Sequence, residues 1–196
     1  MKVKLIKVET AEEVKALIKE GKAKELPSMQ DGWRFNFEKL IKKLKNATGY
    51  LLVTEETPDI IEGALIFQLV DKVMPYMAYL EVAPHNRSNP KKYEQVAGCL
   101  IAYAFQQSVI QGKGDYNSML QFDVLEEKKE DAIKLMAVYS GKYNAKRWDD
   151  TTMVIMDEDG ESLVTKYLIL DTTEKDTTDD GKEKEKPDTN DNTAEQ

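Results

Sequence analysis

The residues most able to carry chemistry lie close together, between positions 79 and 98 of the 196-residue chain. An apolar stretch ends at Val82, and a polar loop and a predicted helix follow it. The start of a helix exposes backbone N–H groups at the positive end of the helix dipole, an arrangement that binds pyrophosphate. Arg87, Lys91 and Lys92 add positive charge there. The same pattern also fits an ordinary strand–helix crossover with solvated lysines, and the residue types alone leave both interpretations open.

One carboxylate, that of Glu81, interrupts the apolar stretch. Its apolar neighbours in the sequence are Met77, Tyr79, Leu80 and Val82. Burying a carboxylate without partners is costly, so a glutamate at this position needs a reason. Glu81 could act as a general base. Alternatively, its side chain could point to solvent or pair with Arg87.

The chain holds one histidine, His85, and one cysteine, Cys99. These numbers exclude an internal disulfide and a Cys/His zinc cluster, and we expect no metal. His85 is predicted to be a surface loop residue and Cys99 a small core residue on a helix. A nucleophilic pair of the two has no evident third group to orient it. The pair Gly112 and Gly114 lacks the preceding strand and following helix of a dinucleotide-binding motif.

Hydrophobic periodicity places these residues within a mixed α/β order. We expect strands over 2–8, 50–53, 61–70, 74–83, 119–124 and 152–156, with a further strand at 162–170. Helices are predicted over 37–44, 91–111 and 130–140. Another helix is predicted to begin at a capping box of Thr10 and Glu13 and to end at Gly21. The strands over 61–70 and 74–83 are apolar almost throughout, which predicts that both faces of the sheet are covered there.

Charge divides the chain into two parts. The net charge is −8, but the last 26 residues, 171–196, carry ten acidic and four basic residues, a net charge of −6. This segment has no aromatic residue and no aliphatic residue larger than alanine. It cannot bury enough surface to offset its ordering entropy, so we predict a domain over 1–170 and a disordered acidic tail over 171–196.

The composition also limits the partners. There is no basic excess to attract nucleic acid. The longest apolar run, 97–105, is far shorter than the roughly 20 residues of a membrane span, so no membrane contact is expected. The N-terminus lacks a secretory apolar core, and we expect a cytoplasmic protein. The oligomeric state is not predicted.

The order of predicted elements resembles the GNAT superfamily of acetyl-CoA-dependent acyltransferases. The resemblance covers about residues 1–157 and is sharpest over 79–105. GNAT proteins carry Val-x-Pro-x-x-Arg at the end of their fourth strand, matched here by Val82, Pro84 and Arg87. The resemblance implies an α/β fold with a central mixed, mostly antiparallel sheet flanked by helices.

A second motif, Arg/Gln-x-x-Gly-x-Gly/Ala, wraps the pyrophosphate of coenzyme A in that superfamily. After a short insertion, Lys92, Gln95 and Ala97 fall on its positions. The resemblance therefore implies cofactor binding by these residues together with the adjacent Val96 and Gly98. Gln95 replaces the first glycine of the motif, and its side chain would crowd the phosphates if its φ is positive.

Further downstream, GNAT proteins carry Leu/Phe-Tyr-x-x-x-Gly-Phe, in which the tyrosine commonly protonates the departing thiolate. Tyr139 falls on that position, and Tyr143-Asn144-Ala145 replaces the ending. A phenol is neutral at pH 7 and can donate a proton. Near a helix end, the same tyrosine could also be an ordinary core or surface residue.

The resemblance thus implies transfer of an acetyl group from acetyl-CoA to an amine acceptor, by direct attack in a ternary complex. Backbone amides near Val82 would polarise the thioester carbonyl, Glu81 would take the amine proton, and Tyr139 would protonate coenzyme A. Trp33 could line the acceptor pocket or belong to the core. The alternative is a catalytically inactive GNAT-fold binding or regulatory module that still binds coenzyme A.

Overall fold

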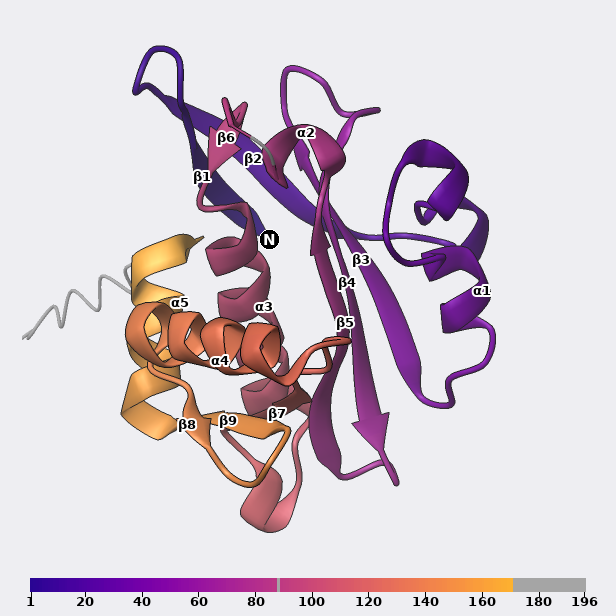
Figure 1. Cartoon of the computed structure of the whole chain (residues 1–196), viewed down its shortest axis with the longest axis vertical. Helices are drawn as coiled ribbons and strands as arrows, with labels where there is room; N and C mark the ends of the chain where they lie inside the picture. The colour runs from indigo at the N-terminus through magenta and orange to yellow at the C-terminus, as the bar shows by residue number, and fades with distance from the viewer. Residues whose placement is uncertain (88, 171–196) are drawn as a thin grey trace, which may run out of the picture.

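The computed structural model describes residues 1–87 and 89–170. Within them ten strands form one sheet and five α-helices lie around it (Figure 1). The segment predicted to be a disordered tail, 171–196, lies outside the described residues. The domain boundary after residue 170 therefore stays a prediction.

The sheet is mixed and mostly antiparallel. Its order is β10, β1, β2, β3, β4, β5, β7, β9, β8, and β6 also pairs with β1. The strands are β1 (Lys2–Lys7), β2 (Glu13–Glu20), β3 (Ala47–Thr54), β4 (Ile61–Val70), β5 (Met74–Val82), β6 (Tyr93–Glu94), β7 (Met119–Asp123), β8 (Lys146–Arg147), β9 (Thr152–Met156) and β10 (Leu168–Ile169). Among the described strands, β5 and β7 form the one parallel pair.

Helices cover both faces of the central strands. The long helix α3 (Val96–Gln111) lies on one face with α4 (Lys129–Tyr143) and α5 (Asp157–Tyr167), and the short α1 (Phe37–Ile41) lies on the other (Figure 1). A one-turn helix, α2 (Pro84–Arg87), follows β5 directly. On β4, Leu65 and Phe67 join the core beneath α3, whereas Ala64 and Ile66 join the core beneath α1. This alternation confirms that these apolar strands are buried on both faces.

Most elements predicted from the sequence are present, with ends displaced by a few residues. The predicted strand over 61–70 has the bounds of β4, and the predicted strands over 2–8, 50–53, 74–83, 119–124 and 152–156 correspond to β1, β3, β5, β7 and β9. The predicted helices over 37–44 and 130–140 correspond to α1 and α4. Among the described residues no helix is long and apolar enough to span a bilayer.

The helix predicted to begin at Thr10 is wrong, because this segment forms β2. Ala16 and Ile18 are buried while Lys15 and Lys19 are exposed, which is the alternation of a strand. β2 pairs with β1 along one edge and with β3 along the other. The apolar residues of this segment fit the periodicity of a helix as well as that of a strand, and hydrogen bonds to a neighbouring strand on each edge therefore select the strand.

Two other predictions are wrong at their boundaries. The predicted strand over 162–170 is the second half of α5, followed by the two residues of β10. Three acidic residues in the first turn of α5 favour this helix, because negative charge is stabilised at a helix N-terminus. The helix predicted from residue 91 begins at Val96, because Tyr93 and Glu94 pair with β1 instead.

Candidate functional site

A gap between β5 and β7 is the main irregularity of the sheet. Among the described residues the two strands pair at one position, Tyr76 opposite Gln121. The register between β4 and β5 also shifts, so that Ala78 forms a bulge opposite Ile66 and Phe67. Beyond this point, the β7-facing edge of β5 has no strand beside it. Because Ala83 donates its N–H to Glu62 on β4, at 2.9 Å, and successive amides alternate, the amides of Leu80 and Val82 face the gap.

A cavity of about 190 Å³, here called the splay cavity, occupies this gap. Its walls include Arg34, Phe35, Leu80, Phe122, Glu126 and Tyr139. Arg34 and Glu126 form an ion pair at its edge, with 3.1 Å between Nη2 and Oε2. The structure thus brings Tyr139 to the edge of β5 that carries the amide of Leu80.

Tyr139 is held as a neutral phenol in this cavity. Burial, and secondly the carboxylate of Glu126, raises the pKa of Tyr139 above the ordinary value of 10. Its ring packs against Phe122 of β7, with ring centroids 4.8 Å apart. A phenol that keeps its proton can donate it to a leaving group.

A second cavity of about 410 Å³, here called the lysine cavity, lies at the start of α3. Three lysines, Lys91, Lys142 and Lys166, line it, against one carboxylate, that of Glu94. The walls also include Val82, Gln95, Val96, Ala97, Tyr143 and Tyr167. The first amides of a helix have no partner within it, so an anion here meets both N–H donors and ammonium groups.

The two cavities follow one another along the same two elements. On β5, Leu80 lines the splay cavity and Val82 the lysine cavity. On α4, Tyr139 lines the splay cavity, whereas Lys142 and Tyr143, one turn later, line the lysine cavity. The arrangement can therefore hold one elongated molecule, with its anionic groups beside the lysines and its other end beside Tyr139.

The turn before α3 carries the one marked departure from the GNAT motif. Gln95 has a φ of 71°, in the left-handed region that favours glycine. Its carbonyl accepts a hydrogen bond from the N–H of Cys99 at 2.9 Å and so begins the helix. Glycine adopts such a positive φ without steric cost, whereas this chain carries a glutamine there.

The residues predicted to bind the cofactor lie in two groups. Val82, Gln95, Val96 and Ala97 line the lysine cavity. Gly98 lies just behind it, and a Cβ there would come within 2.5 Å of the ring of Tyr167, so this glycine serves close packing. The other three, Pro84, Arg87 and Lys92, are absent from the walls of both cavities.

Arg87 and Glu81 hold each other on the face of the sheet that α1 covers. Arg87 Nη1 lies 2.9 Å from Glu81 Oε1, and Arg87 Nη2 donates to the carbonyl of Gly32 at 2.6 Å. Glu81 also accepts from the backbone N–H groups of Arg34 and Phe35, at 2.7 and 3.1 Å. In this structure the Glu81 carboxylate thus holds the segment before α1. It also forms the ion pair with Arg87 that the sequence analysis gave as an alternative to a role as general base.

Several site residues escaped the sequence analysis. Lys142 stands at an unspecified position of the motif that holds Tyr139, Lys166 lies on α5 outside the motifs, and Glu126 lies in the loop after β7. The packing of α5 against α3 brings Lys166 to the site. Trp33 proves to be a core residue, 6% exposed and packed edge-on against Phe37. His85 is exposed, as expected, and its ring also contacts a buried carboxylate, that of Glu62.

No protein-family model matches the chain, and no curated protein matches it significantly. Solved structures do match. The KacTA–DNA complex aligns with a TM-score of 0.53 and 12% identity, over 77% of this chain and 99% of that one. A GNAT family acetyltransferase from Elizabethkingia anophelis with acetyl-CoA bound gives 0.46 and 10%, over 72% and 98%. AtaTR bound with acetyl-CoA gives 0.49 and 14%, over 76% and 97%.

The chain shares its fold with the protein of the KacTA–DNA complex, and its mixed, mostly antiparallel sheet flanked by helices is the fold class that the GNAT resemblance implied. At these identities, the likeness concerns the fold alone. The expectation that nucleic acid is not a partner stays a prediction.

Proposed function

We propose that the protein transfers an acetyl group from acetyl-CoA to an amine acceptor by direct attack in a ternary complex. The observation that carries the proposal is the alignment of the two cavities along β5 and α4. Coenzyme A is long, anionic at one end and reactive at the other. It matches a site with three lysines at one end and a half-buried phenol at the other.

At the lysine cavity the chain would bind the cosubstrate. Lys91, Lys142 and Lys166 would contact the phosphates, together with the backbone amides of Val96 and Ala97. These contacts are the same before and during the reaction, so they would set the affinity for acetyl-CoA and leave turnover unchanged.

At the splay cavity the chain would carry out the reaction. The amide of Leu80, which faces the gap, would donate to the thioester carbonyl, whose oxygen gains negative charge when the amine attacks. Tyr139 would donate its proton to the coenzyme A sulfur as the carbon–sulfur bond breaks. These contacts strengthen in the transition state, so they would set turnover.

Two carboxylates can take the proton that the attacking amine loses. Glu81, proposed from the sequence, lies on the strand that borders the cavity, but its oxygens already accept from Arg87 and from two backbone amides. Glu126 lines the cavity itself, and its side chain is 20% exposed. The Arg34–Glu126 ion pair must open if a cationic amine is to reach Glu126.

Paired variants, Glu81→Gln and Glu126→Gln, decide between these two carboxylates. The variant that replaces the general base by an amide should have a turnover lower by roughly 10²–10⁴-fold, the range of general base catalysis. Glu81→Gln is expected to lower the melting temperature as well, because it removes a buried ion pair. If Glu81→Gln lowers only the melting temperature while Glu126→Gln lowers turnover, the base is Glu126.

Calorimetric titration with acetyl-CoA, followed by release of free thiol with a panel of primary amines, tests the function itself. We expect saturable binding and amine-dependent thiol release. Binding without release for any amine would identify the inactive module instead. Absence of binding would reject the cofactor site.

A further inference from the structure

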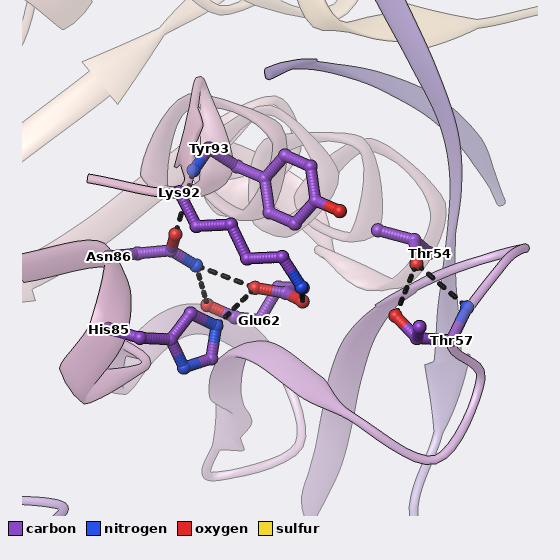
Figure 2. Close-up of polar contacts among 7 residues, drawn as sticks. All are labelled: Thr54, Thr57, Glu62, His85, Asn86, Lys92 and Tyr93. Atoms are coloured by element: carbon purple, nitrogen blue, oxygen red, sulfur yellow. Dashed lines mark hydrogen bonds and ion pairs between the residues drawn. The ribbon is translucent and has the colours of Figure 1, made fainter. Parts of the chain in front are cut away.

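Glu62 is a fully buried carboxylate in the middle of the fold, and neither cavity uses it. Its exposed fraction is 0%, and it lies on β4. Figure 2 shows that the side chains around it come from the segment between β5 and α3. His85 Nε2 lies 2.5 Å from Glu62 Oε2, Asn86 Nδ2 donates to the same oxygen at 2.7 Å, and Lys92 Nζ lies 3.8 Å from Oε1.

Through these contacts the single carboxylate of Glu62 holds two parts of the connection between β5 and α3, namely residues 85–86 and residue 92. His85 and Asn86 belong to α2, at the start of the segment, and Lys92 lies at its end. Asn86 strengthens the connection, because its Oδ1 accepts from the N–H of Tyr93 at 2.9 Å and its Nδ2 also donates to the Glu62 carbonyl at 3.3 Å. Glu62 of β4 thereby contacts two parts of this segment, His85 and Asn86 at its start and Lys92 near its end.

The contacts around Glu62 do not favour stability as much as an apolar side chain at this position would. Glu62 Oε1 has no hydrogen-bond partner among the described residues, since Lys92 Nζ is beyond hydrogen-bond distance. Removing a carboxylate from water is costly, and an apolar side chain of similar volume often gives a more stable protein. A buried and incompletely paired glutamate therefore points to a role other than stability.

The end that Glu62 holds leads directly into the lysine cavity. Lys92 is followed by Tyr93 and Glu94, which pair with β1, and then by Gln95 in its left-handed turn. The carbonyl of Lys92 also accepts from the N–H of Val8 at 3.0 Å. The first amides of α3 are therefore positioned by the residues just before them, which contact Glu62 directly or through Asn86.

We infer that Glu62 is a positioning residue for cofactor binding: it fixes residues 85–86 and 92–93 so that the N-terminal amides of α3 face the lysine cavity. The inference rests on the proposed function for its ligand, but the clamp itself exists without a ligand. Glu62 touches neither cavity, and its effect passes through Asn86, Lys92 and Tyr93.

Glu62→Gln tests this inference, because it keeps the shape and removes the charge. We expect the dissociation constant for acetyl-CoA, measured by calorimetry, to rise about tenfold while the protein stays folded. Glu56→Gln is the matched control, since it removes the same charge from the exposed turn before β4 and should leave affinity unchanged. A lower melting temperature with unchanged affinity would show a merely structural role and overturn the inference.

Amide exchange of the ligand-free protein separates this inference from the proposed function. In Glu62→Gln, exchange at Tyr93 and at the start of α3 should accelerate at least tenfold, with β3 and β4 unchanged. If the wild-type protein binds no acetyl-CoA, the proposed function fails, and faster exchange at α3 would still support the clamp. Unchanged exchange would overturn it.

If Glu62→Gln does not fold, His85→Ala decides, because the side chain of His85 is 40% exposed and its loss leaves no buried gap. Removing one of the contacts of Glu62 should raise the dissociation constant about threefold, and it should also lower the melting temperature, because a buried carboxylate loses a partner. Unchanged affinity and unchanged exchange in His85→Ala would contradict the inference.

Discussion

The splay cavity and the lysine cavity share a strand and a helix but differ in chemistry. The lysine cavity combines lysines with the amides of a helix N-terminus. The splay cavity combines aromatic rings, the free edge of β5 and a phenol whose pKa is raised by burial. Charged groups suit a contact that persists through the reaction, whereas a protonated phenol acts only when a bond breaks. The difference teaches that affinity and turnover should respond to separate sets of residues.

The largest expected effect lies at the splay cavity. Tyr139→Phe removes one oxygen and little packing, so turnover should fall by about 10²–10⁴-fold, the range of general acid catalysis. The Michaelis constant for acetyl-CoA should change little, because the proton is delivered in the transition state. Steady-state kinetics check both values, and Tyr116→Phe, which removes the phenol of an exposed tyrosine, is the control.

The pH profile sharpens the same prediction. A general acid loses activity when it ionises, and the pKa of Tyr139 is raised above 10. The alkaline loss of turnover due to Tyr139 should therefore have its midpoint above pH 10. A turnover of Tyr139→Phe within about twofold of the wild type would end the assignment of Tyr139 as the acid. A loss that small is far below the loss that general acid catalysis predicts.

An intermediate effect is expected at the lysine cavity. Lys142→Gln and Lys166→Gln each remove a charge that would face the phosphates. A hydrogen bond to a charged group contributes about 1.5–3 kcal/mol when buried, and for these accessible lysines we expect roughly a tenfold weaker affinity for acetyl-CoA. Calorimetry checks this at low and high salt, because the difference should shrink when charges are screened.

The control for these variants is Lys134→Gln, which removes an exposed lysine of α4 that pairs with Asp131. Its affinity should equal that of the wild type. If all three lysine variants weaken binding equally, the lysine cavity is not the phosphate site, and the contrast between the two cavities fails.

The smallest effect is expected at Gln95. A residue with a Cβ in the left-handed region costs about 1–2 kcal/mol, part of which Gln95→Gly should recover. The melting temperature should rise by about 2–4 °C for a gain of 1 kcal/mol, with affinity for acetyl-CoA equal or improved. Gln95→Ala should show no such rise, because alanine has the same steric cost. A marked loss of affinity in Gln95→Gly would mean that the glutamine side chain itself contacts the cosubstrate.

Local sequence patterns predicted the elements whose apolar residues fit one periodicity only. The continuous apolar residues of β4 fit a buried strand, and the bounds agree. In β2 the residues Val14, Leu17 and Ile18 fit a helix as well, and only the neighbouring strands β1 and β3 decide the outcome. In α5 the acidic first turn and the buried pair Leu163 and Tyr167 carried the helical signal.

Of the residues predicted to bind the cofactor, those at the two ends of the strand–helix connection meet in the structure, and their role stays a prediction. Val82 at the end of β5 and Gln95, Val96 and Ala97 at the start of α3 line one cavity. Lys166 reaches the same cavity from α5, through the packing of α5 against α3, which no local pattern encodes. Glu62 escaped notice because its partners, His85 and Asn86, lie more than twenty residues away in the sequence.

The most direct test of the central claim, that the two cavities form one acetyl-CoA site, is amide exchange with and without saturating acetyl-CoA. The account predicts slower exchange in two separate segments: at residues 95–98, whose amides would bind phosphate, and at Leu80 and Val82, whose amides on the open edge of β5 would face the bound cosubstrate. Exchange at the distant β1–β2 turn should not change. Protection in neither segment at a saturating concentration would contradict the account, and protection at residues 95–98 alone would separate the cavities.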